Sequence, residues 1–180
     1  QVDDFGLRMA ELRQFSNLGP LAFVVREEPT LRRALESMVR HMSLQNEALA
    51  MRVEEADGLV LIRLQLLGDV PGRLRQATEL AAGVMYRMLT LFLGPAWRPR
   101  SICFTHAPPE SQAACQRVFG MPALYNQDFD QDYPAEGTRL KKAIEGADAV
   151  LVVTPGPVVA ALIARLTAIG EHRNRADHQP

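Results

Sequence analysis

The fold of this chain is decided by the stretch LAMRVEEADGLVLIRLQLLGDVPGRLRQATELAAGVMYRMLTLFLGP, residues 49–95. Apolar and polar residues alternate over residues 49–54, and a second, mostly apolar run covers residues 59–66. Between the two runs stands Asp57-Gly58, a pair that favours a tight turn between antiparallel strands. The first half of the stretch therefore predicts a β-hairpin.

The second half of the stretch predicts a long amphipathic helix. Gly68-Asp69-Val70-Pro71 ends the hairpin. The apolar residues that follow recur at helical spacing and cover about half of the helix circumference; they are Ala77, Leu80, Ala81, Val84, Met85, Met88, Leu91 and Phe92. We expect the helix to end at Gly94-Pro95, because glycine can take the left-handed position after a helix and proline cannot continue one.

Shorter elements are expected on both sides of this stretch. Thr30 is a suitable N-cap for a helix over residues 31–42, whose apolar residues also have helical spacing. Residues 101–105 predict a strand, Pro109 predicts the start of a helix that ends at Phe119-Gly120, and residues 122–125 predict a further short strand. A hairpin mixed with helices predicts a single-domain α+β fold, in which several helices cover one face of a mainly antiparallel sheet.

Composition limits the classes of function. The 180 residues are 47% hydrophobic and 23% charged, which is typical of one folded domain. A net charge of -1 lacks the excess of Lys and Arg that a free-standing nucleic-acid-binding module needs. Cys103 and Cys115 are too few for a disulfide scaffold, so we expect reduced cysteines and a cytoplasmic protein. No apolar run is long enough for a membrane span, and no signal peptide is evident.

The sequence contains no Walker loop, paired-glycine dinucleotide fingerprint, GxSxG elbow or HExxH pair. Asp128, Asp130 and Asp132 have the alternate spacing of a calcium loop, but Tyr133 stands where that loop needs glycine, and its final glutamate is missing. A solvated loop is therefore expected there. We expect no bound metal, no cofactor and no enzymatic activity.

Three residues are candidate contacts for a small molecule. His106 falls on the same strand face as Ile102 and Phe104, so it could point into an apolar pocket; the alternative is a strand-end histidine bonded to the backbone. Arg87 borders the apolar arc of the long helix and could meet a ligand carboxylate, or be an ordinary surface arginine. His41 borders the apolar face of its helix and could equally be solvated.

Two further features have open interpretations. The turn Trp97-Arg98-Pro99-Arg100 could form a cation-π contact or a partner surface, or could plug the end of the sheet. An enzyme that uses His106 with a cysteine is a weaker alternative, because two-residue alternation places Cys103 on the opposite strand face.

Between Phe5 and Asp130, a set of sequence blocks follows in a characteristic order and spacing. The blocks are Phe5-Gly6-Leu7-Arg8, Glu11-Leu12-Arg13, Leu18-Gly19-Pro20-Leu21, Pro29-Thr30-Leu31-Arg32-Arg33-Ala34-Leu35, Leu44-Gln45-Asn46, Arg75-Gln76-Ala77-Thr78-Glu79-Leu80, Leu93-Gly94-Pro95-Ala96-Trp97-Arg98-Pro99 and Val118-Phe119-Gly120-Met121-Pro122. Together they resemble the effector-sensing N-terminal domain of AraC-type bacterial transcription regulators, of the subgroup with an arabinose-binding-like domain.

The resemblance implies an effector-sensing domain over residues 1–130 that lacks its first helices, so we expect a fragment. Residues 131–170 depart from the family pattern and are expected to form a divergent α/β segment with a strand at residues 149–153. Residues 171–180 are expected to be disordered. The single apolar helix expected within residues 150–170 lacks the basic surface of a DNA-recognition helix.

What the resemblance implies about function is a domain that binds a small organic effector. Such a domain would couple the effector to dimerisation, or to DNA through a helix-turn-helix domain that is absent from this sequence. A homodimer is a possible assembly. The alternatives are a dimerisation or interaction module that binds no ligand and, less favoured, an uncharacterised enzyme that acts on a small molecule.

Overall fold

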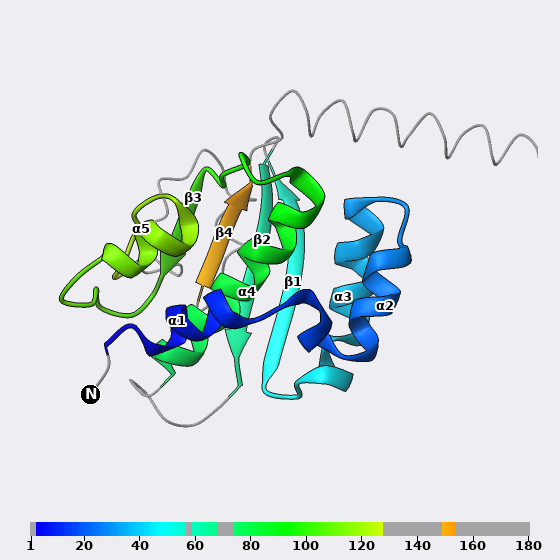
Figure 1. Cartoon of the computed structure of the whole chain (residues 1–180), viewed down its shortest axis with the longest axis horizontal. Helices are drawn as coiled ribbons and strands as arrows, with labels where there is room; N and C mark the ends of the chain where they lie inside the picture. The colour runs from blue at the N-terminus through cyan, green and yellow to red at the C-terminus, as the bar shows by residue number, and fades with distance from the viewer. Residues whose placement is uncertain (1–2, 57–58, 68–73, 128–148, 154–180) are drawn as a thin grey trace, which may run out of the picture.

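The structure, a computed structural model, describes residues 3–56, 59–67, 74–127 and 149–153. In chain order its elements are the helices and strands that Figure 1 labels. They are α1 (Phe5–Leu12), the short 3-10 helix η1 (Phe15–Leu18), α2 (Pro20–Glu27), α3 (Leu31–Gln45), β1 (Leu49–Ala56), β2 (Leu59–Leu66), α4 (Arg75–Leu93), β3 (Ser101–Phe104), α5 (Ala113–Phe119) and β4 (Ala149–Val153).

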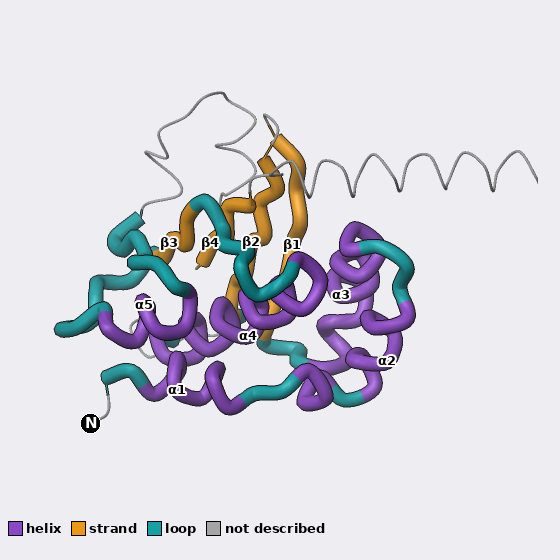
Figure 2. The backbone as a smooth tube through the Cα atoms, turned by 45° about the horizontal axis from the view of Figure 1, so that its top comes forward, coloured by secondary structure: helices purple, strands orange, loops and turns teal. Residues whose placement is uncertain are grey.

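The four strands form one sheet in the order β1-β2-β4-β3, with every neighbouring pair antiparallel. The helices gather on one side of this sheet (Figure 2). This arrangement confirms the predicted α+β fold. The last strand in the sequence, β4, lies between β2 and β3, so the predicted strand at 149–153 joins the same sheet as the hairpin. The rest of residues 131–180, with the predicted disordered tail, lies outside the described residues.

Local signals in the sequence account for several of these elements. The hairpin pairs Ala56 with Leu59, the register that a two-residue Asp57-Gly58 connection requires, although that pair itself lies outside the described residues. Thr30 caps α3, because its hydroxyl oxygen accepts a hydrogen bond from the Arg33 amide at 3.1 Å. Helix α4 ends at Leu93 and is followed by Gly94, whose positive φ of 89° agrees with the predicted glycine stop.

Two predicted boundaries are wrong. Helix α5 begins at Ala113 and not at Pro109, because the chain around Pro109 is held as a loop in which the Glu110 amide donates to the Asp3 carboxylate. The strand predicted over residues 122–125 is reduced to a single parallel bridge between Leu124 and Cys103. That bridge still aligns residues 124–127 beside β3.

The expected burial of the sheet and of α4 also needs correction. Leu61 and Arg63 are buried although they alternate with the core residues Ile62 and Leu64, so both faces of β2 are covered at its centre. On α4 the predicted apolar arc is displaced: Leu91 is 65% exposed. The buried face consists instead of Thr78, Glu79, Ala82, Gly83, Met85, Tyr86, Met88 and Leu89.

Small residues explain this rotation of α4, because they let α1 approach it closely. A Cβ atom added at Gly6 would lie 2.0 Å from the Gln76 carbonyl oxygen, and one added at Gly83 would lie 2.5 Å from the Ala10 Cβ. The Gly6 amide also donates to the Gln76 side chain at 2.6 Å. Helix α4 therefore buries one side against the sheet and another against α1. Because α1 packs on α4, the residues that precede α1 lie beside the first turn of α4.

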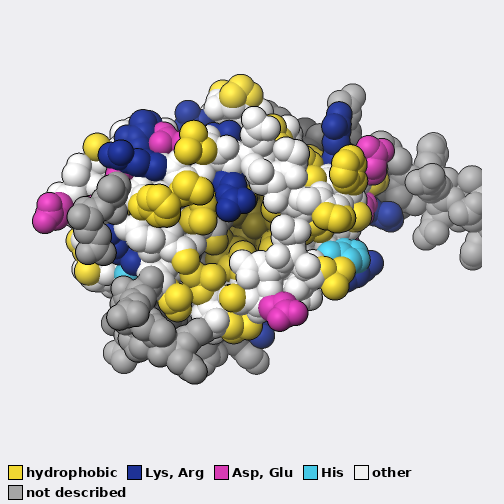
Figure 3. Space-filling view, turned by 60° about the horizontal axis from the view of Figure 1, so that its bottom comes forward, with side chains coloured by type: hydrophobic (Ala, Val, Ile, Leu, Met, Phe, Trp, Pro, Cys, Tyr) yellow, Lys and Arg dark blue, Asp and Glu magenta, His cyan; other side chains and the backbone are white. Residues whose placement is uncertain are grey.

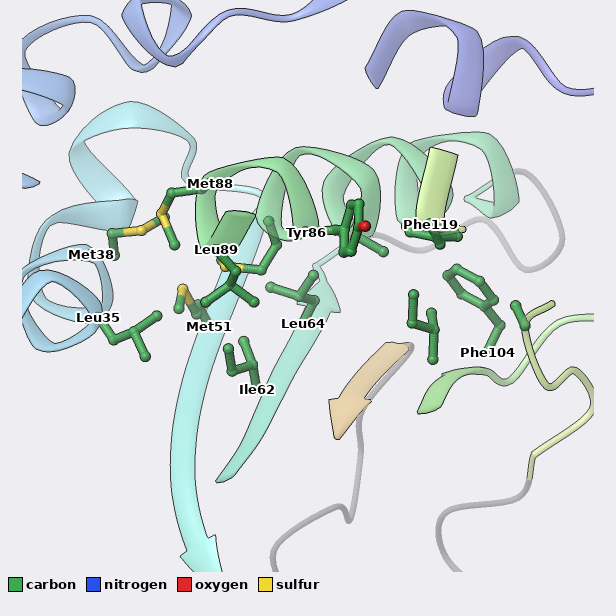
Figure 4. Packing of buried hydrophobic residues seen from close by; sticks show 14 of the residues in the cluster. Leu35, Met38, Met51, Ile62, Leu64, Tyr86, Met88, Leu89, Phe104 and Phe119 are labelled. Atoms are coloured by element: carbon green, nitrogen blue, oxygen red, sulfur yellow. The ribbon is translucent and has the colours of Figure 1, made fainter. Parts of the chain in front are cut away.

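The hydrophobic core lies between α4 and the sheet (Figure 4). Leu35, Met38, Met51, Met88 and Leu89 pack together where α3 and β1 meet α4. Tyr86, Phe104 and Phe119 continue the core toward β3 and α5, and the Tyr86 and Phe119 rings meet edge to face. Within the described ranges, no helix is both long enough and apolar enough to cross a membrane.

Candidate functional site

A carboxyl group is buried in the first turns of α4. Glu79 is 1% exposed, and neither of its carboxylate oxygens has a hydrogen-bond partner among the described residues. An unpaired buried carboxylate is costly, because the charge has lost its water without gaining donors. Such a group needs an explanation beyond packing.

Two basic side chains face Glu79 without hydrogen-bonding to it. Its Oε1 atom lies 3.7 Å from Nη1 of Arg75, one turn earlier on α4, and 3.8 Å from Nε2 of His106. Both separations exceed the donor-acceptor distance of a hydrogen bond. The two groups therefore contribute charge near the carboxylate but leave its lone pairs unfilled.

Arg75 is engaged by the residues that precede α1. Its Nη2 atom donates to the Asp3 carbonyl at 2.8 Å and also contacts the Asp3 carboxylate. Asp3 is tied further to α4 through the Gln76 side chain at 2.6 Å, and to the β3–α5 loop through the Glu110 amide at 3.2 Å. Asp3 thus connects α4 to that loop. The guanidinium of Arg75 lies within salt-bridge distance of two carboxylates, those of Asp3 and Glu79.

Stacked aromatic rings form another side of the site. The backbone of residues 124–127 hydrogen-bonds to β3 and to His106, which brings Tyr125 beside them. Ring centroids are 4.9 Å apart for Phe104 and His106, 5.4 Å for Phe104 and Tyr125, and 5.3 Å for His106 and Tyr125. A hydrogen bond of 2.8 Å joins the Tyr125 hydroxyl to the Cys115 thiol.

One ring nitrogen of His106 contacts the backbone. Nδ1 lies 2.9 Å from the Ala107 carbonyl oxygen, which can only accept, so Nδ1 carries a hydrogen and donates. The other nitrogen, Nε2, faces the Glu79 carboxylate.

Burial shifts the titration of these groups. Loss of water raises the pKa of Glu79 to about 7, Arg75 opposes this rise, and Asp3 and Asp4 reinforce it. Burial also raises the pKa of the Cys115 thiol and of the Tyr125 hydroxyl, and their mutual hydrogen bond raises that of Tyr125 further. Near neutral pH, Cys115 and Tyr125 are therefore uncharged, whereas Glu79 is divided between its two forms.

The three sequence-predicted contact residues are not brought together. His106 is 17% exposed in its side chain and belongs to the Glu79 cluster, defined here as Glu79, Arg75, His106, Tyr125 and Cys115. Arg87 is exposed and follows Glu79 by eight residues, which is about 12 Å along a helix.

His41 lies at the far end of the sheet from His106. Its helix, α3, packs on β1, three strands from β3, a separation of about 14 Å. The His41 Nδ1 atom contacts the Ser37 carbonyl at 2.9 Å, a bond within its own helix. Nothing in this geometry links His41 to the Glu79 cluster.

Sequence reasoning missed Glu79 itself. Its position three, four and seven residues before Ala82, Gly83 and Tyr86 puts it on their helix face, but these residues were not recognised as the buried face. The signal was therefore present as periodicity. It was hidden because the larger apolar residues of α4 follow a different arc.

The turn after α4 has structural contacts. Arg98 donates to the carbonyls of Pro95 and Trp97 at 2.8 and 2.7 Å, and Trp97 stacks on Tyr86 with ring centroids 6.0 Å apart. A Cβ atom at Gly120 would lie 2.3 Å from Nε of Arg98, so the guanidinium covers the end of α5. These contacts favour the structural interpretation of the turn over a partner surface.

Comparisons with known proteins agree with the arrangement. The family described as "Arabinose-binding domain of AraC transcription regulator, N-term" matches residues 1–131. The HTH-type transcriptional regulator VirS of Mycobacterium tuberculosis, in strains CDC 1551 / Oshkosh and ATCC 25618 / H37Rv, is 29% identical over 145 residues. That alignment covers 78% of this chain and 43% of VirS, so the chain spans less than half the length of these relatives.

A solved structure shares the fold. The crystal structure of transcriptional regulator CdpR from Pseudomonas aeruginosa superposes with a TM-score of 0.60 at 15% sequence identity, over 82% of this chain and 42% of that chain. The likeness therefore extends to three-dimensional architecture where sequence identity is low.

Proposed function

Because the chain belongs to the family of AraC-type transcription regulators with an N-terminal arabinose-binding domain, we propose that it senses a small organic effector at the Glu79 cluster. The observation that carries this proposal is the buried Glu79 carboxylate, whose oxygens lack hydrogen-bond donors among the described residues. Unsatisfied buried groups concentrate at functional sites, because a ligand can supply what the fold leaves out.

Sensing requires only that the effector prefers one state of the regulator over another. A differential affinity of about 1–3 kcal/mol is sufficient to shift such an equilibrium. Asp3 is suited to communicate binding, since it contacts Arg75 beside Glu79 and Glu110 in the loop after β3. The proposed output is a change in dimerisation, or in the placement of a DNA-binding domain in a longer cytoplasmic polypeptide. No catalytic residue is part of this proposal.

A thermal-shift screen tests the sensing function. The protein is heated with a broad panel of sugars, carboxylates, amino acids, amines and fatty acids, and the midpoint temperature Tm is recorded for each. The proposal expects at least one compound to raise Tm, because a ligand that binds the folded state stabilises it. It also expects His106→Ala to remove that rise and Arg87→Ala to preserve it. A panel without any stabilising compound would contradict the sensing function.

The alternative, an interaction module without a ligand, is favoured by exposed apolar side chains. Phe23 on α2 and Leu44 at the end of α3 are 74% and 84% exposed. Hydrophobic side chains also gather in a hollow on the face seen in Figure 3. Exposed apolar surface of this kind is typical of contact sites. Sedimentation of the protein over a range of concentrations tests for a homodimer, and Phe23→Ser and Leu44→Ser should weaken a dimer that uses these residues.

A further inference from the structure

We propose that Glu79 is the titrating part of a pH-dependent latch, in which its ionisation weakens the bond between Asp3 and Arg75 and so loosens the link from α4 to the β3–α5 loop. The latch is defined here as Asp3 with its contacts to Arg75, Gln76 and Glu110. It goes beyond the proposed sensing function, because it needs no effector. Three features of the structure carry it: a shared guanidinium, the position of Asp3, and a buried carboxyl group.

Arg75 lies between two carboxyl groups. Its Nη2 atom bonds to the carbonyl and the carboxylate of Asp3, whereas Nη1 is 3.7 Å from Oε1 of Glu79, beyond hydrogen-bond distance. In the structure the guanidinium therefore bonds to Asp3 and not to Glu79. A negative charge on Glu79 would attract the same guanidinium, and water screens a buried charge only weakly. The two carboxylates thus compete for one cation.

Asp3 connects parts of the fold that are far apart in the sequence. Its carbonyl oxygen accepts from the Gln76 side chain at 2.6 Å, and its carboxylate accepts from the Glu110 amide at 3.2 Å. The Asp3 side chain is 49% exposed, so water can replace these partners at little cost. Helix α1 is held separately, because Gly6 packs directly on the Gln76 backbone. Opening of the latch therefore releases the loop from α4 without displacing α1.

Charged and titratable groups face Glu79 from the elements packed around it. Among the described residues these are Arg75 on α4, Asp3 and Asp4 before α1, His106 after β3, Cys115 on α5, and Tyr125 in the segment beside β3. Burial raises the pKa of Glu79 to about 7; Arg75 opposes this rise, and the two aspartates reinforce it. A protonated His106 ring would also attract the Glu79 carboxylate, so a test must separate the titration of these two groups.

The repulsion between Asp3 and Glu79 acts in both directions. Because bound Asp3 makes Glu79 harder to ionise, ionised Glu79 must make Asp3 harder to hold, and by the same factor. A tenfold weakening of the latch corresponds to a difference of about one unit in the pKa of Glu79. The latch is therefore closed while Glu79 is protonated, below about pH 7, and weakened above that pH.

NMR spectra of the full chain test the latch through the Glu110 amide. An amide proton that donates to a carboxylate resonates downfield, so loss of the Asp3 contact should move the Glu110 signal upfield. We expect this shift between about pH 6 and pH 8, with the same midpoint as the Glu79 carboxyl carbon. The Arg33 amide, which donates to Thr30 at the start of α3, is the internal control and should not follow that midpoint.

Three variants separate Glu79 from its neighbours. Glu79→Gln should remove the pH-dependent shift of the Glu110 signal, because the amide stays neutral while His106 still titrates. The exposed Glu36→Gln is the matched control and should retain the shift. Asp3→Asn should lower the midpoint of the Glu79 carboxyl group by about 0.5–1 pH unit, which corresponds to a three- to tenfold coupling.

Three results would overturn the latch. The first is a Glu110 signal that does not follow the Glu79 midpoint. The second is an equal shift in Glu79→Gln, which would assign the titration to His106. The third is an unchanged Glu79 midpoint in Asp3→Asn. The search for a stabilising effector is independent of these results, so its failure beside a confirmed latch would remove the sensing function alone.

Discussion

The two ends of the helical layer bury their side chains equally well but fill the interior with different chemistry. Where α3 and β1 meet α4, the interior is aliphatic and rich in methionine, and Met38, Met51 and Leu89 belong to one hydrophobic cluster. Where β3 and α5 meet α4, it contains Glu79 and the Cys115–Tyr125 hydrogen bond. Packing alone explains the first end. The second end contains the Glu79 carboxyl group, which has no hydrogen-bond partner among the described residues and which packing does not require. This difference distinguishes the structural core from the candidate site.

The largest expected effect lies at the aliphatic end. Leu89→Ala should lower the free energy of unfolding by about 3 kcal/mol, because it removes buried methyl groups and leaves a cavity. The loss should be the same at pH 6 and pH 8, since no titratable group is involved. Urea denaturation measures it, and Leu91→Ala on the exposed side of α4 is the control, with a change within about 0.5 kcal/mol.

At the polar end, a substitution of Glu79 is expected to raise the free energy of unfolding. The folded-state pKa of Glu79, about 7, lies above its ordinary value of 4.5, so the folded state binds the proton more tightly. Stability therefore falls as pH rises from about 4.5 to 7 and is constant above that range.

Glu79→Gln removes this loss. At pH 8 the variant should be more stable than the unsubstituted protein by about 3 kcal/mol, and near pH 4 the two should be alike. Urea denaturation across this pH range measures the difference. A variant that is less stable at pH 8 would mean that the Glu79 carboxylate has favourable partners in the folded protein.

A smaller effect on stability is expected at the hydrogen bond between Tyr125 and Cys115, where the buried polar groups of this end are paired. Tyr125→Phe removes the hydroxyl that is bonded to Cys115 but keeps the ring, which stacks on Phe104 and is tilted against His106. The free energy of unfolding should fall by about 1 kcal/mol, the usual contribution of one buried hydrogen bond. Urea denaturation of the variant beside the unsubstituted protein measures this loss. An unchanged free energy of unfolding would mean that this hydrogen bond does not stabilise the folded protein.

The smallest effect is expected for Arg87. It lies on the exposed side of α4, so Arg87→Ala should change stability by less than about 0.5 kcal/mol and leave effector binding unaltered. Thermal-shift titration of this variant beside His106→Ala gives the comparison. A loss of binding in Arg87→Ala would mean that the effector reaches well beyond the Glu79 cluster.

The sequence predicted the elements whose signals are local. The hairpin follows from alternation around Asp57-Gly58, and the end of α4 follows from Gly94. The start of α5 was misplaced, because a tertiary bond from Glu110 to Asp3 decides the conformation near Pro109. Local signals do not contain such a contact.

The candidate site was predicted only through His106. Glu79 becomes buried because Gly6 and Gly83 admit α1 against α4, a contact between residues far apart in the sequence. Arg75 joins the site through Asp3, which is also distant in sequence. Periodicity of the large apolar residues on α4 gave the wrong buried face, since small residues form much of the true one.

The most direct test of the account is an NMR titration of the Glu79 carboxyl carbon, assigned by its absence in Glu79→Gln. We predict a midpoint near pH 7, because burial of the carboxyl group disfavours its ionised form. A midpoint near the ordinary value of 4.5 would contradict the burial of an unpaired carboxylate at this position.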